Sequence, residues 1–173
     1  MMPTLTTRRS ALAGLAAWLV FPVAARARED FIDLDWVDLI PPGKENIEQR
    51  LQGMGILPHD EMSTLRGQQP PSSGVRTDYN GKVVRLPGYM IPLGTSAAGV
   101  TEFILVPYVG ACIHVPPPPA NQLVFVTTGK PYESSGLFEA VNVTGMFGTA
   151  ATSTQLGDIG YALSADRIEP FTR

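Results

Sequence analysis

The chain has 173 residues, 44% of them hydrophobic, which fits a single globular domain. A formal net charge of −3 without a basic stripe argues against nucleic acid and anionic membrane surfaces as partners. The 16 prolines and 17 glycines are typical of a loop-rich β domain, and a single cysteine excludes an internal disulfide.

Residues 1–27 have the pattern of a signal peptide. Arg8 and Arg9 form a basic start, residues 11–21 are apolar, and Ala25-Arg26-Ala27 is a small-residue cleavage motif. We therefore expect cleavage near Ala27 and a periplasmic location. The residues around the arginine pair also resemble a twin-arginine signal, so the sequence leaves both export routes open.

Removal of residues 1–27 takes away three arginines and no acidic residue, which shifts the formal charge from −3 to −6. The apolar stretch is shorter than the roughly 20 residues that span a bilayer. We therefore expect an acidic mature chain without a transmembrane segment.

Residues 28–80 are predicted to form an N-terminal arm, a short helix and a loop. In the arm, Trp36, Leu39 and Ile40 form an apolar face that we expect to pack on the domain, and Pro41-Pro42 ends any regular element. Residues 44–54 have helical spacing of apolar side chains. Residues 66–80 carry few large apolar residues, which predicts a mobile loop.

Residues 81–173 are predicted to form a β-barrel domain, because the apolar pattern changes to a period of two after the turn at Asn80-Gly81. A bulge is expected near Pro87-Gly88. We expect a mainly β fold, a small five-stranded OB-like barrel whose closure hides the sheet edges, with a β-sandwich as the alternative. The predicted strands are residues 82–93, 101–107, 122–128, 137–147 and 158–164, the last followed by 167–170.

Cys112 and His114 are the main candidate metal ligands. On an extended backbone their side chains would lie on one face, with Cβ atoms roughly 6 to 7 Å apart, a spacing that suits zinc or copper. A further ligand is needed, and His59, beside two carboxylates, is a candidate that also fits a solvated turn. The same pair also fits a buried thiol with a structural histidine, or a reactive thiolate.

The residues around this pair are candidates for binding. Pro116, Pro117, Pro118 and Pro119 predict an extended polyproline segment, either a rigid wall for the site or an exposed docking rib for a partner. Asn121 and Gln122 supply amide groups that can tie the turn to backbone groups. Tyr108 precedes the motif and is included as a binding residue.

Several segments together resemble a known bacterial family. They are Gly88-Tyr89-Met-Ile-Pro92, Glu102-Phe-Ile-Leu-Val-Pro-Tyr108, Val143-Thr-Gly145 and, above all, the run Gly110-Ala-Cys-Ile-His-Val-Pro-Pro-Pro-Pro-Ala-Asn-Gln122. From Trp36 to Phe171 the chain resembles the family called domain of unknown function 3299. The resemblance implies an exported protein of the Gram-negative cell envelope. It also implies a link of some members to transporter components and metal homeostasis, and site residues among Cys112, His114, Asn121 and Gln122 with undefined roles.

The leading hypothesis is a non-enzymatic periplasmic binding or adaptor protein that handles zinc or another transition metal for an envelope transport system. One alternative is a structural protein-interaction module without metal. Another is an enzyme that uses the thiol of Cys112. The sequence leaves the activity, the metal, the partner and the oligomeric state open.

Overall fold

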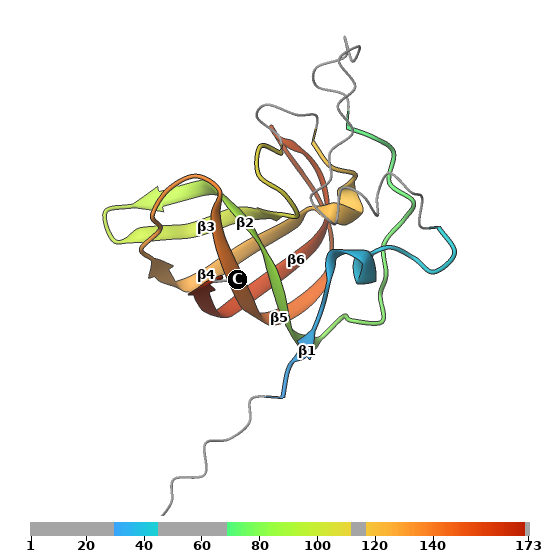
Figure 1. The fold of residues 1–173 in the computed structure, drawn as a ribbon, viewed down its shortest axis with the longest axis horizontal. Helices are drawn as coiled ribbons and strands as arrows, with labels where there is room; N and C mark the ends of the chain where they lie inside the picture. Colours follow the sequence, from blue (N-terminus) through green and yellow to red (C-terminus); the bar gives the residue numbers. More distant parts are fainter. Residues whose placement is uncertain (1–29, 45–68, 112–116, 172–173) are drawn as a thin grey trace, which may run out of the picture.

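A computed structural model describes residues 30–44, 69–111 and 117–171 (Figure 1). Strands dominate this part of the chain, which confirms a mainly β fold. The elements are β1 (Ile32–Asp33), η1 (Trp36–Leu39), β2 (Lys82–Ser96), β3 (Gly99–Val106), η2 (Ala120–Gln122), β4 (Val124–Tyr132), β5 (Glu139–Thr154) and β6 (Gly157–Pro170), where η marks a 3-10 helix.

The strands form one mixed sheet in the order β1-β2-β3-β4-β6-β5, and β2 also pairs with β5. The five strands β2 to β6 therefore form a partial ring. β4 and β6 run parallel, whereas the other neighbours in the ring are antiparallel. All five predicted strands are present. The sixth, β1, is an addition to the prediction, because two residues are too short to show an alternating pattern.

The ring strands differ from the predicted ranges mainly in their length. β5 continues to Thr154. β6 is continuous across residues 158–164 and 167–170, which were predicted as two separate segments. The end of β5 is rich in Gly, Ala, Ser and Thr, so it lacks the apolar alternation that marks a strand. Gln122, expected at the start of the third strand, lies in η2 instead.

β2 pairs first with β5 and then with β3. The prediction of a bulge at Pro87-Gly88 is wrong. The register with β5 is unbroken from Lys82 to Met90, and the register shifts fall between Pro92 and Thr95, against β3. Gly88 serves a different purpose. A Cβ on Gly88 would lie 2.8 Å from Leu105 Cγ, so the absence of a side chain lets β2 approach β3 closely as it leaves β5.

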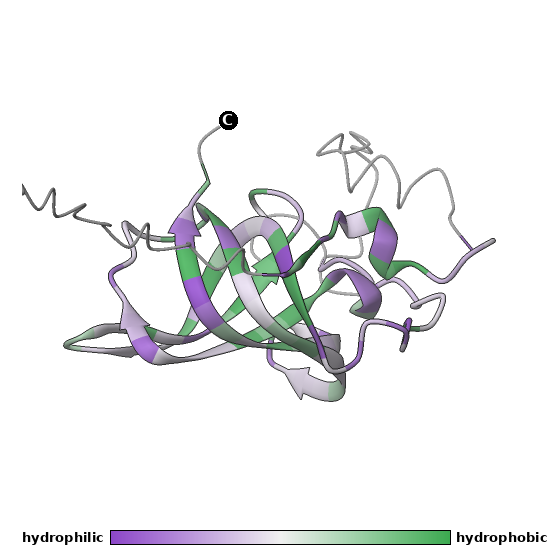
Figure 2. Cartoon of the chain, turned by 90° about the horizontal axis from the view of Figure 1, so that it is seen from below, coloured by the Kyte–Doolittle hydropathy of each residue, from purple (hydrophilic) through white to green (hydrophobic). Residues whose placement is uncertain are grey.

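Apolar and polar residues alternate along strands of the ring (Figure 2). Val141 and Val143 on β5 are fully buried, while Asn142 between them is half-buried on the other face. β3 is buried on both faces, because Phe103, Ile104, Leu105 and Val106 are all fully buried.

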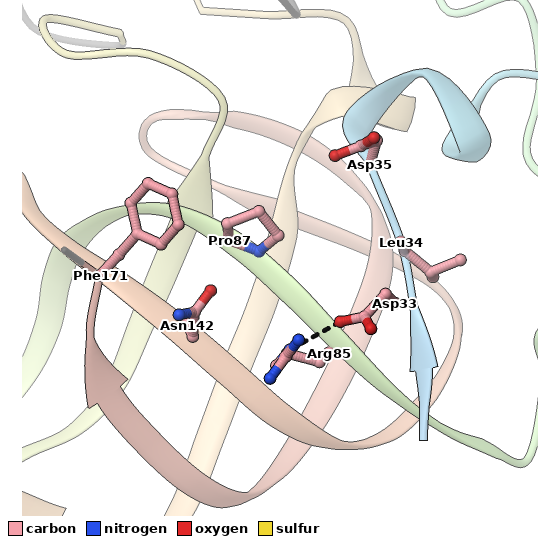
Figure 3. A pocket seen from close by; sticks show the side chains of 7 residues that line it. All are labelled: Asp33, Leu34, Asp35, Arg85, Pro87, Asn142 and Phe171. Carbon is pink, nitrogen blue, oxygen red and sulfur yellow. Dashed lines mark hydrogen bonds and ion pairs between the residues drawn. The ribbon is translucent and has the colours of Figure 1, made fainter. Parts of the chain in front are cut away.

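The N-terminal arm lies on the sheet, as predicted. Leu34 N donates to Arg85 O at 2.9 Å, and Trp36 Nε1 donates to Pro87 O at 2.7 Å. Leu34, Trp36 and Leu39 are buried, while Asp33 pairs with Arg85 on β2 (Figure 3). The arm is therefore fixed by both apolar packing and hydrogen bonds. The helix predicted for residues 44–54 lies outside the described residues, except for Lys44.

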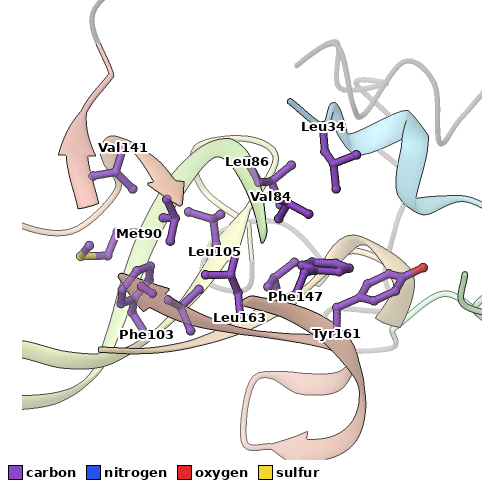
Figure 4. Packing of buried hydrophobic residues seen from close by; sticks show 14 of the residues in the cluster. Leu34, Val84, Leu86, Met90, Phe103, Leu105, Val141, Phe147, Tyr161 and Leu163 are labelled. Atoms are coloured by element: carbon purple, nitrogen blue, oxygen red, sulfur yellow. The ribbon is translucent and has the colours of Figure 1, made fainter. Parts of the chain in front are cut away.

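The main core fills the interior of the ring (Figure 4). It combines β-branched and larger apolar side chains from β2 to β6 with Leu34, Trp36 and Leu39 of the arm. The ring of Phe147 lies against that of Tyr161, with centroids 5.1 Å apart. The core residues are Leu34, Trp36, Leu39, Val84, Leu86, Met90, Val100, Phe103, Leu105, Val124, Val126, Val141, Val143, Phe147, Tyr161, Leu163 and Ala165.

A second, smaller cluster lies on the other face of β3. It brings Ile104 and Val106 together with Tyr108, Ala111 and Leu123 from the connection between β3 and β4. The cluster fixes both described ends of that connection on the sheet. Among the described residues, no helix is both long and apolar enough to cross a membrane.

Candidate functional site

The structure describes part of the predicted central stretch. Cys112, His114 and Pro116 lie in residues 112–116, and His59 lies in residues 45–68, so all four are outside the described residues. The metal ligands therefore stay a prediction. Within residues 30–44, 69–111 and 117–171, no group of three or more His, Cys, Asp or Glu residues lies close enough to hold a metal ion.

The described prolines pack against the protein. Pro117 is half-buried, and Pro118 and Pro119 are buried. Pro119 has φ −54° and ψ 153°, which is the extended backbone predicted for the proline run. Gln69 Nε2 donates to Pro118 O at 2.9 Å. These three prolines form a wall on the domain and offer little free surface for docking.

The amides of η2 tie this turn to the arm and to the loop. Gln122 Nε2 donates to Trp36 O and to Asn121 O, each at 2.9 Å. Asn121 Nδ2 donates to Ser73 Oγ at 3.0 Å. Both side chains are almost completely buried, at 0% and 1% exposure. Gln122 therefore ties the turn to backbone groups, as expected, whereas Asn121 contacts a side-chain hydroxyl.

The oxygens of the same two amides are buried acceptors. Asn121 Oδ1 and Gln122 Oε1 have no hydrogen-bond partner in the described part of the chain. Because both acceptors of Gln122 Nε2 are carbonyl oxygens, the orientation of this amide is determined by its contacts.

Gln69 forms a clamp between the proline wall and β6. Besides its bond to Pro118, its Nε2 donates to Asp158 O at 2.8 Å, and Asp158 N donates to Gln69 Oε1 at 2.7 Å. Sequence reasoning missed this residue, because it lies in the loop predicted to be mobile. The described part of that loop has no helix or strand, as predicted, but it is tied to the sheet by specific hydrogen bonds.

Tyr161 on β6 joins the same loop to the arm. Its hydroxyl accepts a hydrogen bond from Arg76 N at 2.7 Å and donates one to Leu39 O at 2.6 Å. Burial raises the pKa of Tyr161, so the hydroxyl keeps its proton. Arg76 also donates to Asp38 O at 2.9 Å, and the hydrogen bond to Asp78 raises the pKa of the guanidinium.

These side chains form a single network, here called the polar cap. It joins three segments distant in the sequence, namely the arm at η1, residues 69–76 and η2, and it fastens them to β6. Its side chains are Gln69, Ser73, Arg76, Asn121, Gln122 and Tyr161. Close packing accompanies it, because a Cβ on Gly160 of β6 would lie 2.8 Å from Ala120 O.

Tyr108 lies at the other described end of the motif. It is 4% exposed and belongs to the second apolar cluster, with Val106 and Ala111. Ala111, the last described residue before Cys112, is fully buried. Tyr108 therefore helps to hold the entry to the predicted metal-binding segment.

The family model described as "Protein of unknown function (DUF3299)" matches residues 36–170. The chain belongs to this family. The crystal structure of a DUF3299 family protein from Pseudomonas aeruginosa PAO1 is similar over 83% of this chain and 98% of that chain, with 35% sequence identity and a TM-score of 0.66. No curated protein matches the chain. The resemblance inferred from the central motif is therefore confirmed.

Proposed function

We propose that this DUF3299 member is an exported periplasmic binding or adaptor protein that handles zinc or another transition metal for an envelope transport system. Cys112 and His114 supply the thiolate and imidazole that such metals prefer. The remaining ligands come from His59, from carboxylates or from the transport partner.

One observation carries the proposal. The five residues from 112 to 116, which contain both candidate ligands, lie between two fixed ends. Ala111 is fully buried in the second cluster, and residues 118–122 are held by the polar cap. A ligand segment whose ends are already fixed loses less conformational entropy when it binds a metal.

The same geometry weighs against the interaction module. That alternative needs the proline run as an exposed rib, whereas Pro118 and Pro119 are buried and Pro118 O is engaged by Gln69. A wall of buried prolines supports a binding segment better than a docking surface.

We also propose that the partial ring is an OB-like barrel. The cyclic order β2-β3-β4-β6-β5, with β4 and β6 parallel, supports this. OB-fold proteins bind their ligands on the face of the second and third strands, which in this chain are β3 and β4. Cys112 and His114 belong to the connection between these two strands.

The test is a zinc and copper titration of the purified chain in competition with a chromophoric chelator. We expect micromolar or tighter binding in the parent and at least a tenfold loss in Cys112→Ala and in His114→Ala, equal to about 1.4 kcal/mol or more. His59→Ala tests the third ligand. Asp166→Asn, which changes an exposed carboxylate, is the control and should bind like the parent. A parent that binds neither metal at micromolar concentration contradicts the proposal.

A further inference from the structure

A pocket lies between the N-terminal arm and the outer face of the sheet. Its volume is about 260 Å³. Figure 3 shows its side chains converging from the arm, β2, β5 and the C-terminal end of the described chain. The groups used below are Asp33, Asp35, Arg85, Pro87, Asn142 and Phe171. The pocket shares no residue with the predicted metal site.

The walls of the pocket are fixed by backbone contacts. Asp33 is in register with Arg85, and Pro87 is in register with Asn142. Trp36 Nε1 holds Pro87 O at 2.7 Å, and Phe171 N donates to Ala140 O at 2.8 Å. The pocket is therefore formed before any ligand enters, which is usual for small-molecule sites.

Arg85 provides a positive group whose position is set. Its Nε donates to Asp33 Oδ1 at 2.6 Å, and its guanidinium carbon lies 4.5 Å from the centre of the Phe31 ring. No hydrogen bond to a described residue uses Nη1 or Nη2. That end of the guanidinium fork can receive a carboxylate, with the amide of Asn142 beside it in the pocket.

Asp35 provides a separate negative group, and its side chain also takes part in the capping box at the start of η1 with Asp38. Its backbone is extended, with φ −104° and ψ 161°. Figure 3 shows the side chains of Asp33 and Asp35 on the same side of the arm, and the rise of an extended chain places their Cβ atoms roughly 6 to 7 Å apart. Asp33 is engaged by Arg85, whereas Asp35 lines the pocket further along the arm. Pro87 and the ring of Phe171, which is 38% exposed, add apolar surface.

We propose that this pocket binds a small zwitterion, an amino acid whose carboxylate and ammonium groups are separated by a short methylene chain. The carboxylate binds Arg85 and Asn142, the ammonium group binds Asp35, and the methylenes lie against Pro87 and Phe171. Two carboxylates against one guanidinium disfavour a simple anion, and a simple cation would leave the open end of the Arg85 guanidinium without a carboxylate. The volume lies below the roughly 300 Å³ at which drug-sized sites begin, which fits a ligand of amino-acid size.

The test compares three probes of matched length on the purified full chain. These are 5-aminovalerate, which carries both charges, valerate, which lacks the amine, and pentylamine, which lacks the carboxylate. Nuclear magnetic resonance titration follows the backbone signals of Arg85 and Asn142. We expect saturable shifts with 5-aminovalerate at millimolar concentration and at least tenfold weaker binding of the other two. No saturable shift with 5-aminovalerate, or equal binding of valerate or pentylamine, overturns the proposal.

Variants locate the two charges. Arg85→Met should abolish saturable binding of 5-aminovalerate. Asp35→Asn should remove the preference for 5-aminovalerate over valerate. Because this change preserves the size of the side chain, it still tests the proposal if Arg85→Met lowers stability. Asp166→Asn, an exposed carboxylate outside the pocket, should bind like the parent. Undiminished binding in Asp35→Asn overturns the proposal.

Discussion

The ring interior and the polar cap hold the same domain together by different physics. The interior consists of apolar side chains, such as Phe103 and Leu105, that are completely withdrawn from water. In the polar cap, Gln122 and Tyr161 instead direct hydrogen bonds at individual carbonyl oxygens of the arm. Burial of area is non-directional, whereas each hydrogen bond specifies one partner. The interior therefore supplies most of the stability, and the cap determines where the arm and the central motif lie.

The largest effect is expected from a cavity in the interior. Phe103→Ala removes a fully buried ring and should lower the free energy of unfolding by about 3 to 5 kcal/mol. Leu93→Ala is the control, because Leu93 is 42% exposed and its loss should change stability by less than about 0.5 kcal/mol. Urea denaturation measures both. Equal losses in the two variants would contradict an interior packed as described.

A second change tests overpacking of the ring. A Cβ on Gly145 of β5 would overlap Ser164 O and lie 2.8 Å from Ala165 Cα on β6. Gly145→Ala should therefore cost about 1 to 3 kcal/mol. Gly129→Ala is the matched control, because no atom lies within 4 Å of the added methyl group. Thermal unfolding of both variants checks this, and a neutral Gly145→Ala would show that the two strands separate easily.

The polar cap should be more tolerant. Gln122→Met keeps the length of the side chain but leaves Trp36 O and Asn121 O without their donor. It also removes Oε1, which has no hydrogen-bond partner in the described part of the chain. We expect a loss of about 1 to 2 kcal/mol in urea denaturation. Gln155→Met on an exposed turn is the control and should be close to neutral. A loss as large as that of Phe103→Ala would remove the distinction between the two regions.

The smallest effect is expected for the pair Glu139 and Tyr132, which lies outside both the ring interior and the polar cap. Burial alone would raise the pKa of Glu139, but hydrogen bonds from Tyr132, Ser135 and Ser134 outweigh it and lower the pKa below its ordinary value of 4.5. The folded state therefore gains stability above pH 4.5 that disappears as the pH falls through the lowered pKa. Glu139→Gln should lose part of the acid dependence of unfolding. An unchanged difference between neutral and acidic pH would contradict this.

Tyr132, the partner of Glu139, should make stability depend on pH at the alkaline end of the range. Burial, followed by the hydrogen bond to Glu139, raises the pKa of Tyr132 to about 12. Its neutral form is favoured in the folded state, so this stability is present below pH 10 and is lost between pH 10 and 12. In alkaline unfolding experiments, Tyr132→Phe should reduce the loss of stability across that interval. An identical alkaline slope in the variant would exclude this role for Tyr132.

The sequence predicts the ring interior well and the polar cap poorly. Apolar residues reveal the five ring strands, by alternation where every second side chain faces the core and by a continuous apolar run in β3, which is buried on both faces. The cap joins residues far apart in the chain, such as Leu39 with Tyr161, and no local pattern encodes such contacts. The importance of Asn121 and Gln122 followed from their place in the motif, but the partners of Gln69 required the fold.

The zwitterion pocket was not predictable from sequence. Its residues come from the arm, β2, β5 and the C-terminal end, and none belongs to a motif. Arg85 and Asp33 are ordinary surface residues in the sequence. Only the parallel pairing of β1 with β2 brings them into register and creates the pocket.

The most direct test of the proposed function is elemental analysis by mass spectrometry on protein isolated from the periplasmic fraction, beside Cys112→Ala and His114→Ala. We predict near-stoichiometric zinc or copper in the parent and its loss in both variants. Parent protein that is free of metal and binds none when metal is added would contradict metal handling. Absence of the protein from the periplasmic fraction would contradict export.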